Sequence, residues 1–136
     1  MKQVQQITAE RGYIGLEADT WNGLGERARY AGQFERAREC YQNYIRLMRM
    51  ANNRFSIGIG LLNLAYVNIR VGCFDEGLDR LEHSEETLAS VGASDTLPYL
   101  FQLVRLAHAA GVGDWETYDH FWSSFAEGFP EEAKLY

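Results

Sequence analysis

The sequence has only two prolines, Pro98 and Pro130, and only two cysteines, Cys40 and Cys73, among its 136 residues. It has no run of about 18 apolar residues, and its N-terminus lacks the basic, apolar and small-residue blocks of a signal peptide. Because the two thiols form neither a CxxC motif nor a ligand-spaced pair, we expect them to pack as small hydrophobic side chains. These scarcities argue against a disulfide framework and a membrane partner, and they favour a cytoplasmic location.

Apolar side chains make up 46% of the sequence and charged ones 24%, which is typical of one folded domain with a hydrophobic core. The net charge of −6 is unevenly distributed. Residues 1–54 hold nine basic and six acidic side chains, whereas residues 55–136 hold four and thirteen. The basic half could steer an acidic partner, but the acidic balance of the whole chain argues against nucleic acid as a ligand.

Glycine and asparagine recur about every twenty residues, at positions suited to the left-handed conformation that closes a helix. These residues are Gly12, Gly32, Asn52, Gly72, Gly92, Gly113 and Gly128. Between them, apolar residues follow helical spacing and no segment alternates as a strand does. The pattern predicts an all-α chain of about seven helices, at residues 1–11, 14–31, 34–51, 54–71, 74–91, 96–111 and 115–127. Short turns between them make neighbouring helices antiparallel.

Every second helix repeats the same pattern, so the unit is a helical pair of about 40 residues. A shift of 40 brings Gly32 onto Gly72, Phe34 onto Phe74, Ala37 onto Gly77, Leu24 onto Leu64 and Gly25 onto Ala65. Small residues at Gly25 and Ala37 predict that the two helices of a pair approach closely. We expect the larger Trp21, Leu24 and Tyr41 to fill the space around that contact.

The first copy resembles the tetratricopeptide repeat (TPR) family, through Trp21, Leu24, Gly25, Gly32, Phe34, Ala37 and Tyr41. It departs from the family pattern at Ala28, where a tyrosine is usual. The resemblance implies a right-handed α-solenoid of antiparallel helix pairs at residues 13–52, 53–92 and 93–127. Residues 1–12 would then end a preceding pair or cap the array, and residues 128–136 would form a C-terminal tail. The 40-residue period is similar to the longer variants found in scaffold proteins and in sensor arrays of bacterial kinases, ATPases and transcription regulators.

The third copy fits less well, because Tyr118 stands where Ala37 and Gly77 stand in the first two. Terminal repeats are often atypical. An aromatic stripe follows in the last helix, at Trp115, Tyr118, Trp122, Phe125 and Phe129. We expect this stripe to seal the end of the array, with a binding patch as the alternative.

The sequence offers no catalytic constellation and no metal or cofactor motif. His83, His108 and His120 make no HExxH pair or other ligand spacing, and no glycine-rich loop follows a strand. We therefore expect a protein that is not an enzyme, with a protein or peptide as its partner.

In this family the first helix of each pair lines a concave groove that holds a peptide. The helical phase assigns to this groove Asn22, Glu26, Arg29, Tyr30, Ile59, Leu62, Asn63, Tyr66, Ile69, Arg70 and Arg105. Asn63 and Tyr66 are the expected anchors, and Arg29 and Arg70 the expected readers of charge. A solvated asparagine with no ligand is an equally good interpretation of Asn63.

Two other functions fit the same pattern. The chain could be a regulatory or sensor segment of a larger bacterial signalling protein. It could also be a structural spacer that forms homo-oligomers through the ends of the array.

Overall fold

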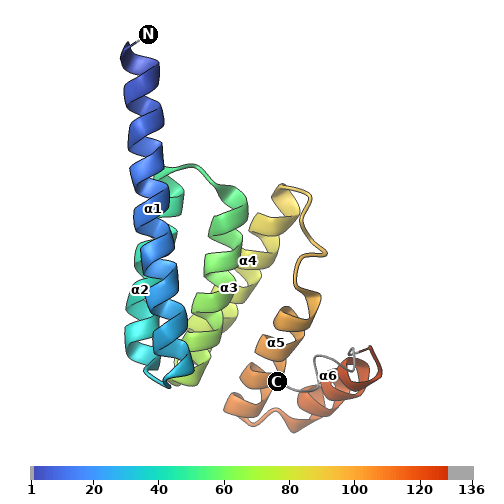
Figure 1. The fold of residues 1–136 in the computed structure, drawn as a ribbon. Helices are drawn as coiled ribbons and strands as arrows, with labels where there is room; N and C mark the ends of the chain where they lie inside the picture. The colour runs from blue at the N-terminus through green and yellow to red at the C-terminus, as the bar shows by residue number, and fades with distance from the viewer. Residues whose placement is uncertain (1, 129–136) are drawn as a thin grey trace.

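The computed structural model describes the backbone of residues 2–128 and the side chains of residues 12–124. Within that part the chain is all-helical. Its six helices are α1 (Lys2–Tyr30), α2 (Phe34–Met50), α3 (Arg54–Arg70), α4 (Phe74–Ser90), α5 (Pro98–Val112) and α6 (Trp115–Gly128). Consecutive helices from α1 to α5 alternate in direction, and the pairs follow one another across the molecule (Figure 1). The tail expected at residues 128–136 lies almost entirely outside the described residues.

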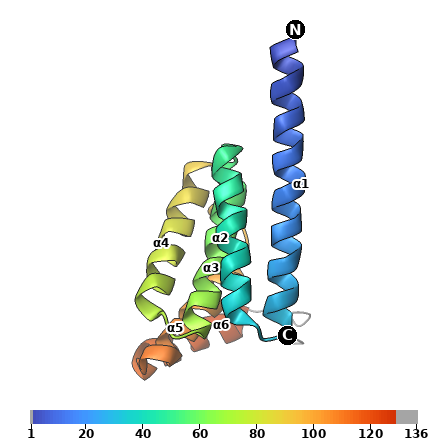
Figure 2. The same ribbon diagram turned by 90° about the vertical axis from the view of Figure 1, so that its left-hand side faces the viewer.

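The first helix differs from the prediction, because Gly12 does not end it. The helices expected at residues 1–11 and 14–31 form the single helix α1, so the described part has six helices rather than seven. A lone glycine weakens a helix by only about 1 kcal/mol, and the hydrogen-bond ladder of α1 continues through it. The boundary expected after residue 12 therefore lies inside α1, whose N-terminal part extends well beyond the end of α2 (Figure 2).

The other predicted helix ends are correct where the structure describes a turn. Gly32, Gly72, Gly92 and Gly113 all have positive φ, and Asn52 has φ 52°. In the α1–α2 and α3–α4 turns, the amide three residues past the helix donates to a carbonyl in its last turn, as Gln33 does to Ala28 at 2.8 Å. Three-residue connections of this kind place α1 beside α2 and α3 beside α4.

Side chains cap the starts of two helices. The Ser56 amide donates to Asn53 Oδ1 at 3.1 Å at the start of α3. At the start of α6 the Thr117 amide donates to Asp114 Oδ1, also at 3.1 Å, and the Thr117 hydroxyl donates to the other carboxylate oxygen. These hydrogen bonds from Thr117 lower the pKa of Asp114.

The close approach predicted within the first two helical pairs is present. A Cβ atom added to Gly25 would lie 2.9 Å from Cε1 of Tyr41, which is closer than real Cβ atoms come. A Cβ added to Gly77 would lie 2.5 Å from Ile69 and 3.2 Å from the Ala65 carbonyl oxygen. Gly25 and Gly77 thus let α1 lie against α2 and α4 against α3 at short range.

The core is built around α3, which contacts α2, α4 and α5. On its α2 side, Leu61 and Leu64 join Tyr41 and Ile45 in one buried cluster. On its α5 side, a second cluster joins α3 to Leu81 and Val104. Cys40 is buried, as expected of a small hydrophobic side chain, whereas Cys73 is half-buried, and both thiols are free.

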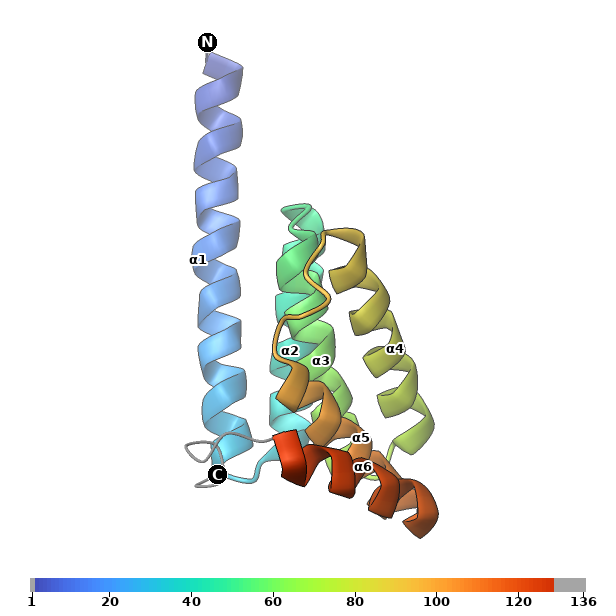
Figure 3. The ribbon, with the colours of Figure 1, turned by 90° about the vertical axis from the view of Figure 1, so that its right-hand side faces the viewer.

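The third pair is attached differently from the first two. Residues 91–97 form a longer connection, in which Leu97 has φ 50°, and α5 starts at Pro98 rather than at residue 96. α5 contacts α4 less extensively than α3 contacts α2. α6 runs across the lower end of α5 instead of alongside it (Figure 3).

One difference between the repeats coincides with that looser contact. Gly60 lies so close to α2 that an added Cβ would come within 2.8 Å of Ile45. Superposing Gly72 on Gly113, the glycines that follow α3 and α5, places Phe101 at the position of Gly60. A phenylalanine needs more room than a glycine at this position, which is consistent with the looser contact of α5 with α4.

Candidate interaction surface

Three of the predicted groove residues contact one another at the end of α1. Arg29 lies 2.5 Å from the Glu26 carboxylate, whose other oxygen accepts a 2.6 Å hydrogen bond from the Tyr41 hydroxyl. The Arg29 guanidinium also lies 5.2 Å from the centre of the Tyr30 ring. Tyr30 itself is 81% exposed, so this network presents an aromatic ring to solvent beside a positive charge.

Burial and charge act on this network together. Burial by itself lowers the pKa of Arg29, whereas the nearby Tyr41 and Glu26 raise it, and the net shift is upward. Burial and then the hydrogen bond to Glu26 raise the pKa of Tyr41 well above its ordinary value. Arg29 is therefore a permanently charged group fixed by Glu26, and Tyr41 is a fully buried, protonated donor.

A second contact of the same kind lies at the end of α3. The Arg70 guanidinium lies 4.8 Å from the ring centre of Phe34, the first residue of α2. α1 and α3 end on the same side of the molecule, where only the turn 31–33 separates Tyr30 from Phe34 (Figure 1). We call Arg29, Tyr30, Phe34 and Arg70 the arginine–aromatic edge. Within the described part of the chain, Arg70 has no ion pair.

The remaining predicted residues do not join this edge. Leu62 and Ile69 are only 0% and 5% exposed, because they pack with Val104 in the cluster between α3 and α5. Arg105 pairs with Glu85 and so faces α4. The groove phase assigned from the sequence therefore places Leu62, Ile69 and Arg105 at helix interfaces, where they offer little or no surface to a peptide in that groove.

The two expected anchors also have little exposed surface. Asn63 is only 8% exposed, and Tyr66 is partly buried against both core clusters beside α3. Ile59 and Asn22 are intermediate in exposure. Of the four residues singled out from the sequence, only Arg29 and Arg70 are part of the edge.

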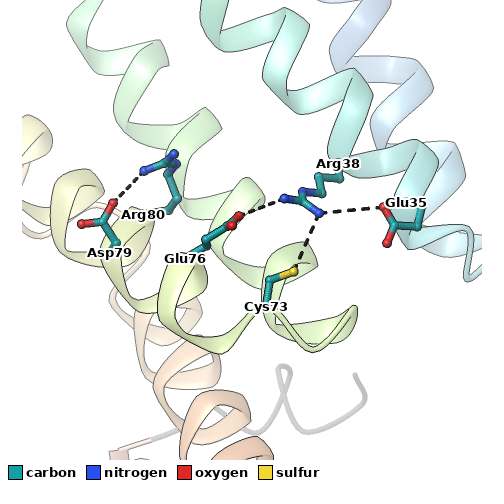
Figure 4. A network of polar contacts seen from close by, with 6 residues as sticks. All are labelled: Glu35, Arg38, Cys73, Glu76, Asp79 and Arg80. Atoms are coloured by element: carbon teal, nitrogen blue, oxygen red, sulfur yellow. Dashed lines mark hydrogen bonds and ion pairs between the residues drawn. The ribbon is translucent and has the colours of Figure 1, made fainter.

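A further polar network joins α2 to α4 near the same end of the molecule. Arg38 lies 2.9 Å from Glu76 and 3.9 Å from Glu35, and it donates to the Cys73 sulfur at 3.8 Å (Figure 4). Arg80 pairs with Asp79 on α4 alone. The Arg38–Glu76 contact is not predictable from the sequence, since its partners lie 38 positions apart and no local spacing marks them. The network links successive pairs at their second helices.

The aromatic stripe of α6 is ordered along the helix. Trp115 and Tyr118 make an edge-on contact at 5.6 Å, and Tyr118 and Trp122 are parallel at 6.5 Å. Trp115 remains 59% exposed. The Phe125 side chain and Phe129 lie outside the described residues.

The described residues hold no group of three or more histidine, cysteine, aspartate or glutamate side chains arranged to bind a metal ion. No helix in the same part of the chain has both the length and the apolar run needed to cross a bilayer. Comparison with protein-family models, curated proteins and solved structures finds no match to the chain. The class that the fold defines is an all-helical chain of successive helical pairs.

Proposed function

We propose that this chain is a non-catalytic, TPR-like interaction module whose helical pairs stack as a solenoid. Its support is the 40-residue period, together with the close helix contacts that Gly25 permits on the first helix of one pair and Gly77 on the second helix of the next. Stacked helical pairs expose extended surfaces made from equivalent positions, and such surfaces bind protein segments. The same class of function follows from the family resemblance.

We place the binding site for a protein segment at the arginine–aromatic edge. Tyrosine and arginine are enriched among the residues that dominate binding energy at protein interfaces. Tyr30 is exposed, and Arg70 has its guanidinium supported by the Phe34 ring and no ion pair in the described residues. An acidic segment that carries an aromatic or aliphatic side chain fits this chemistry, because carboxylates pair with arginine while the rings bury the apolar group.

The test is selection of peptides from a random display library, followed by affinity measurement of a selected peptide by titration calorimetry. Acidic peptides with an aromatic residue are the expected winners. A Tyr30→Ala, Arg70→Glu double variant should weaken binding by about a hundredfold, since both groups are lost at the centre of the contact. Both side chains are exposed, so the fold should be unaffected.

Arg46→Glu is the matched control. Arg46 is an exposed arginine of α2, three turns along the helix from Phe34, and its replacement makes the same charge change as Arg70→Glu. Affinity should change by less than about threefold. An equal loss of affinity in Arg46→Glu and in the double variant would mean that the peptide responds only to overall charge. An unchanged affinity in the double variant would contradict the assignment of the site to the edge.

Self-association through the ends of the array is a second candidate, favoured by one observation. α1 extends past α2, and Tyr13 and Leu16, near the start of the described side chains, are 73% and 68% exposed. Apolar side chains at that exposure are typical of a surface that meets another helix. Light scattering across a wide concentration range tests self-association. A dimer that dissociates in the Tyr13→Ser, Leu16→Ser double variant supports it. A monomer at every concentration contradicts it.

A further inference from the structure

The side of α1 that faces away from α2 carries a continuous row of exposed residues. α1 stands at the edge of the molecule and packs chiefly against α2, toward which Ala18 and Ala28 are buried (Figure 2, Figure 3). Residues spaced alternately three and four apart follow one face of a helix, and here that face is opposite to the two alanines. We call this row the outer stripe of α1. Its members, all exposed, are Tyr13, Leu16, Thr20, Gly23, Arg27 and Tyr30.

The middle of the outer stripe is made of small residues that are ready for a helix contact. An added Cβ at Gly23 would meet nothing within 4 Å, so no contact within one copy of the chain requires a glycine there. The Thr20 hydroxyl already donates to the Leu16 carbonyl at 3.0 Å, and it therefore needs no further partner when it is covered. Another helix can approach closely at this point, because no large side chain holds it away.

The order of sizes along the outer stripe is complementary to itself. Large side chains lie toward both ends and small ones at the centre, so a second α1 fits when it runs in the opposite direction. In that register the two helices cross at their small residues, and the large residues fill the space on either side. A two-fold dimer uses the same patch on both copies, as this arrangement does. The opposed residues are Tyr13 with Tyr30, Leu16 with Arg27, and Thr20 with Gly23.

The charges on α1 favour the same register. Arg27 and Glu17 are both exposed, and neither has an ion pair within the described residues. They are ten positions apart on one helix, or about 15 Å, so they cannot pair within one copy. Between antiparallel copies, Arg27 lies opposite Leu16 and therefore beside Glu17 of the other copy. Two-fold symmetry makes this contact twice, and this charge complementarity makes a second copy the fitting occupant of the stripe.

We propose that two copies of this chain associate through the outer stripe, with their α1 helices antiparallel and crossing at Thr20 and Gly23. The inference rests on the self-association candidate above, and it specifies the surface and the register. The stripe is only about 25 Å long, so the interface is small and the expected dissociation constant is on the order of 10–100 µM. Because Tyr30 also belongs to the arginine–aromatic edge, the dimer and a peptide bound at that edge exclude each other.

The first test is sedimentation equilibrium of the whole chain from about 1 µM to about 1 mM, with wild type and Gly23→Leu compared. The leucine has free space in a single copy, so the variant should keep its helical circular dichroism. At the crossing point, however, a leucine separates the two helices, and the dissociation constant should rise by at least about tenfold. A surface that associates only because it is apolar would gain affinity from the same substitution.

The second test exchanges the two charges. Arg27→Glu and Glu17→Arg, made singly, each place like charges together and should weaken the dimer by about three- to tenfold. The variant with both substitutions restores the opposite charges and should return to within about twofold of wild type. Arg46→Glu on α2 is the control, since it makes the same charge change as Arg27→Glu away from the stripe; it should alter the dissociation constant by less than about twofold.

The outcomes separate this inference from the proposals on which it does and does not rest. A monomer at every concentration overturns it together with the self-association candidate, and leaves peptide binding at the arginine–aromatic edge intact. A dimer that Gly23→Leu strengthens, or that the double charge exchange fails to restore, overturns the antiparallel register alone. A dimer that Arg46→Glu weakens as much as Arg27→Glu does responds only to overall charge, and this too contradicts the assignment to the outer stripe.

Discussion

Glycine inside a helix normally lowers stability by about 1 kcal/mol relative to alanine, yet Gly77 lies within α4. The neighbouring α3 explains it, because an added methyl group would meet Ile69 and the Ala65 carbonyl oxygen. We expect Gly77→Ala to lower the free energy of unfolding by about 1–3 kcal/mol, as overpacking does. Urea denaturation measures the change.

Gly23 is the matched control for this substitution. It also lies inside a helix, but an added Cβ meets nothing within 4 Å. Gly23→Ala should therefore raise the free energy of unfolding by about 1 kcal/mol. Changes of the same sign at both positions would mean that close helix contact does not determine the effect.

Tyr41 predicts a stability change at alkaline pH. Its pKa is raised in the folded chain, so the unfolded chain loses the phenol proton first, near pH 10. Stability from this group is present below about pH 10 and declines as the pH rises above it. Tyr41→Phe loses the hydrogen bond to Glu26 and should cost about 1 kcal/mol at neutral pH.

The difference between wild type and Tyr41→Phe isolates the titration of this one phenol from that of the other tyrosines. Chemical denaturation at several pH values should show the wild-type advantage shrinking above about pH 10. An advantage that stays constant up to pH 11 would argue that Tyr41 titrates normally in the folded chain.

At the scale of elements, capping differs between helices that otherwise match closely. α3 has a side-chain cap from Asn53, whereas Gln33, in the same position before α2, makes no such bond. Asn53→Ala should lower the free energy of unfolding by about 1 kcal/mol, and Gln33→Ala should leave it almost unchanged. Thermal unfolding followed by circular dichroism compares the two variants, and equal losses would show that the Asn53 bond contributes nothing specific.

The elements also show how far the sequence predicts this fold. α2, α3 and α4 were each predicted within one residue, because a left-handed glycine or asparagine and a regular apolar pattern coincide at their ends. Gly12 has the spacing that predicts a helix end, but the helix continues through it. Whether a helix continues past a glycine depends on the packing beyond that residue. The start of α5 was misplaced because the positive φ of Leu97 follows from the loop geometry and not from a residue that favours it.

The candidate site was predicted less well, for a related reason. Helical phase places Arg29 and Tyr30 together near the end of α1, where Tyr30 is exposed and Arg29 half-buried, but it assumes that every first helix meets its neighbour in the same way. In the structure Leu62 and Ile69 are buried in the cluster that α3 forms with α4 and α5. Contacts between side chains far apart in sequence, such as Arg38 and Glu76, carry no signal that periodicity could detect.

Across the whole molecule, packing declines from the middle of the chain toward its C-terminal end. α3 contacts three other helices and is buried over most of its length, whereas α6 packs chiefly against α5. In arrays of this kind, stability is approximately a sum of pair and neighbour contributions. The third pair is therefore the part of the described chain expected to open first.

Native-state hydrogen exchange tests this gradient directly. Amides of α3 should open only with global unfolding, whereas those of α6 should exchange about a hundredfold faster, through local opening of the third pair. Low concentrations of urea should leave the α6 rates nearly unchanged while accelerating α3, because only the slow amides require exposure of a large surface. Equal protection of α3 and α6 at every urea concentration would instead mean that all three pairs unfold as one cooperative unit, and that the looser contact of α5 with α4 costs no stability.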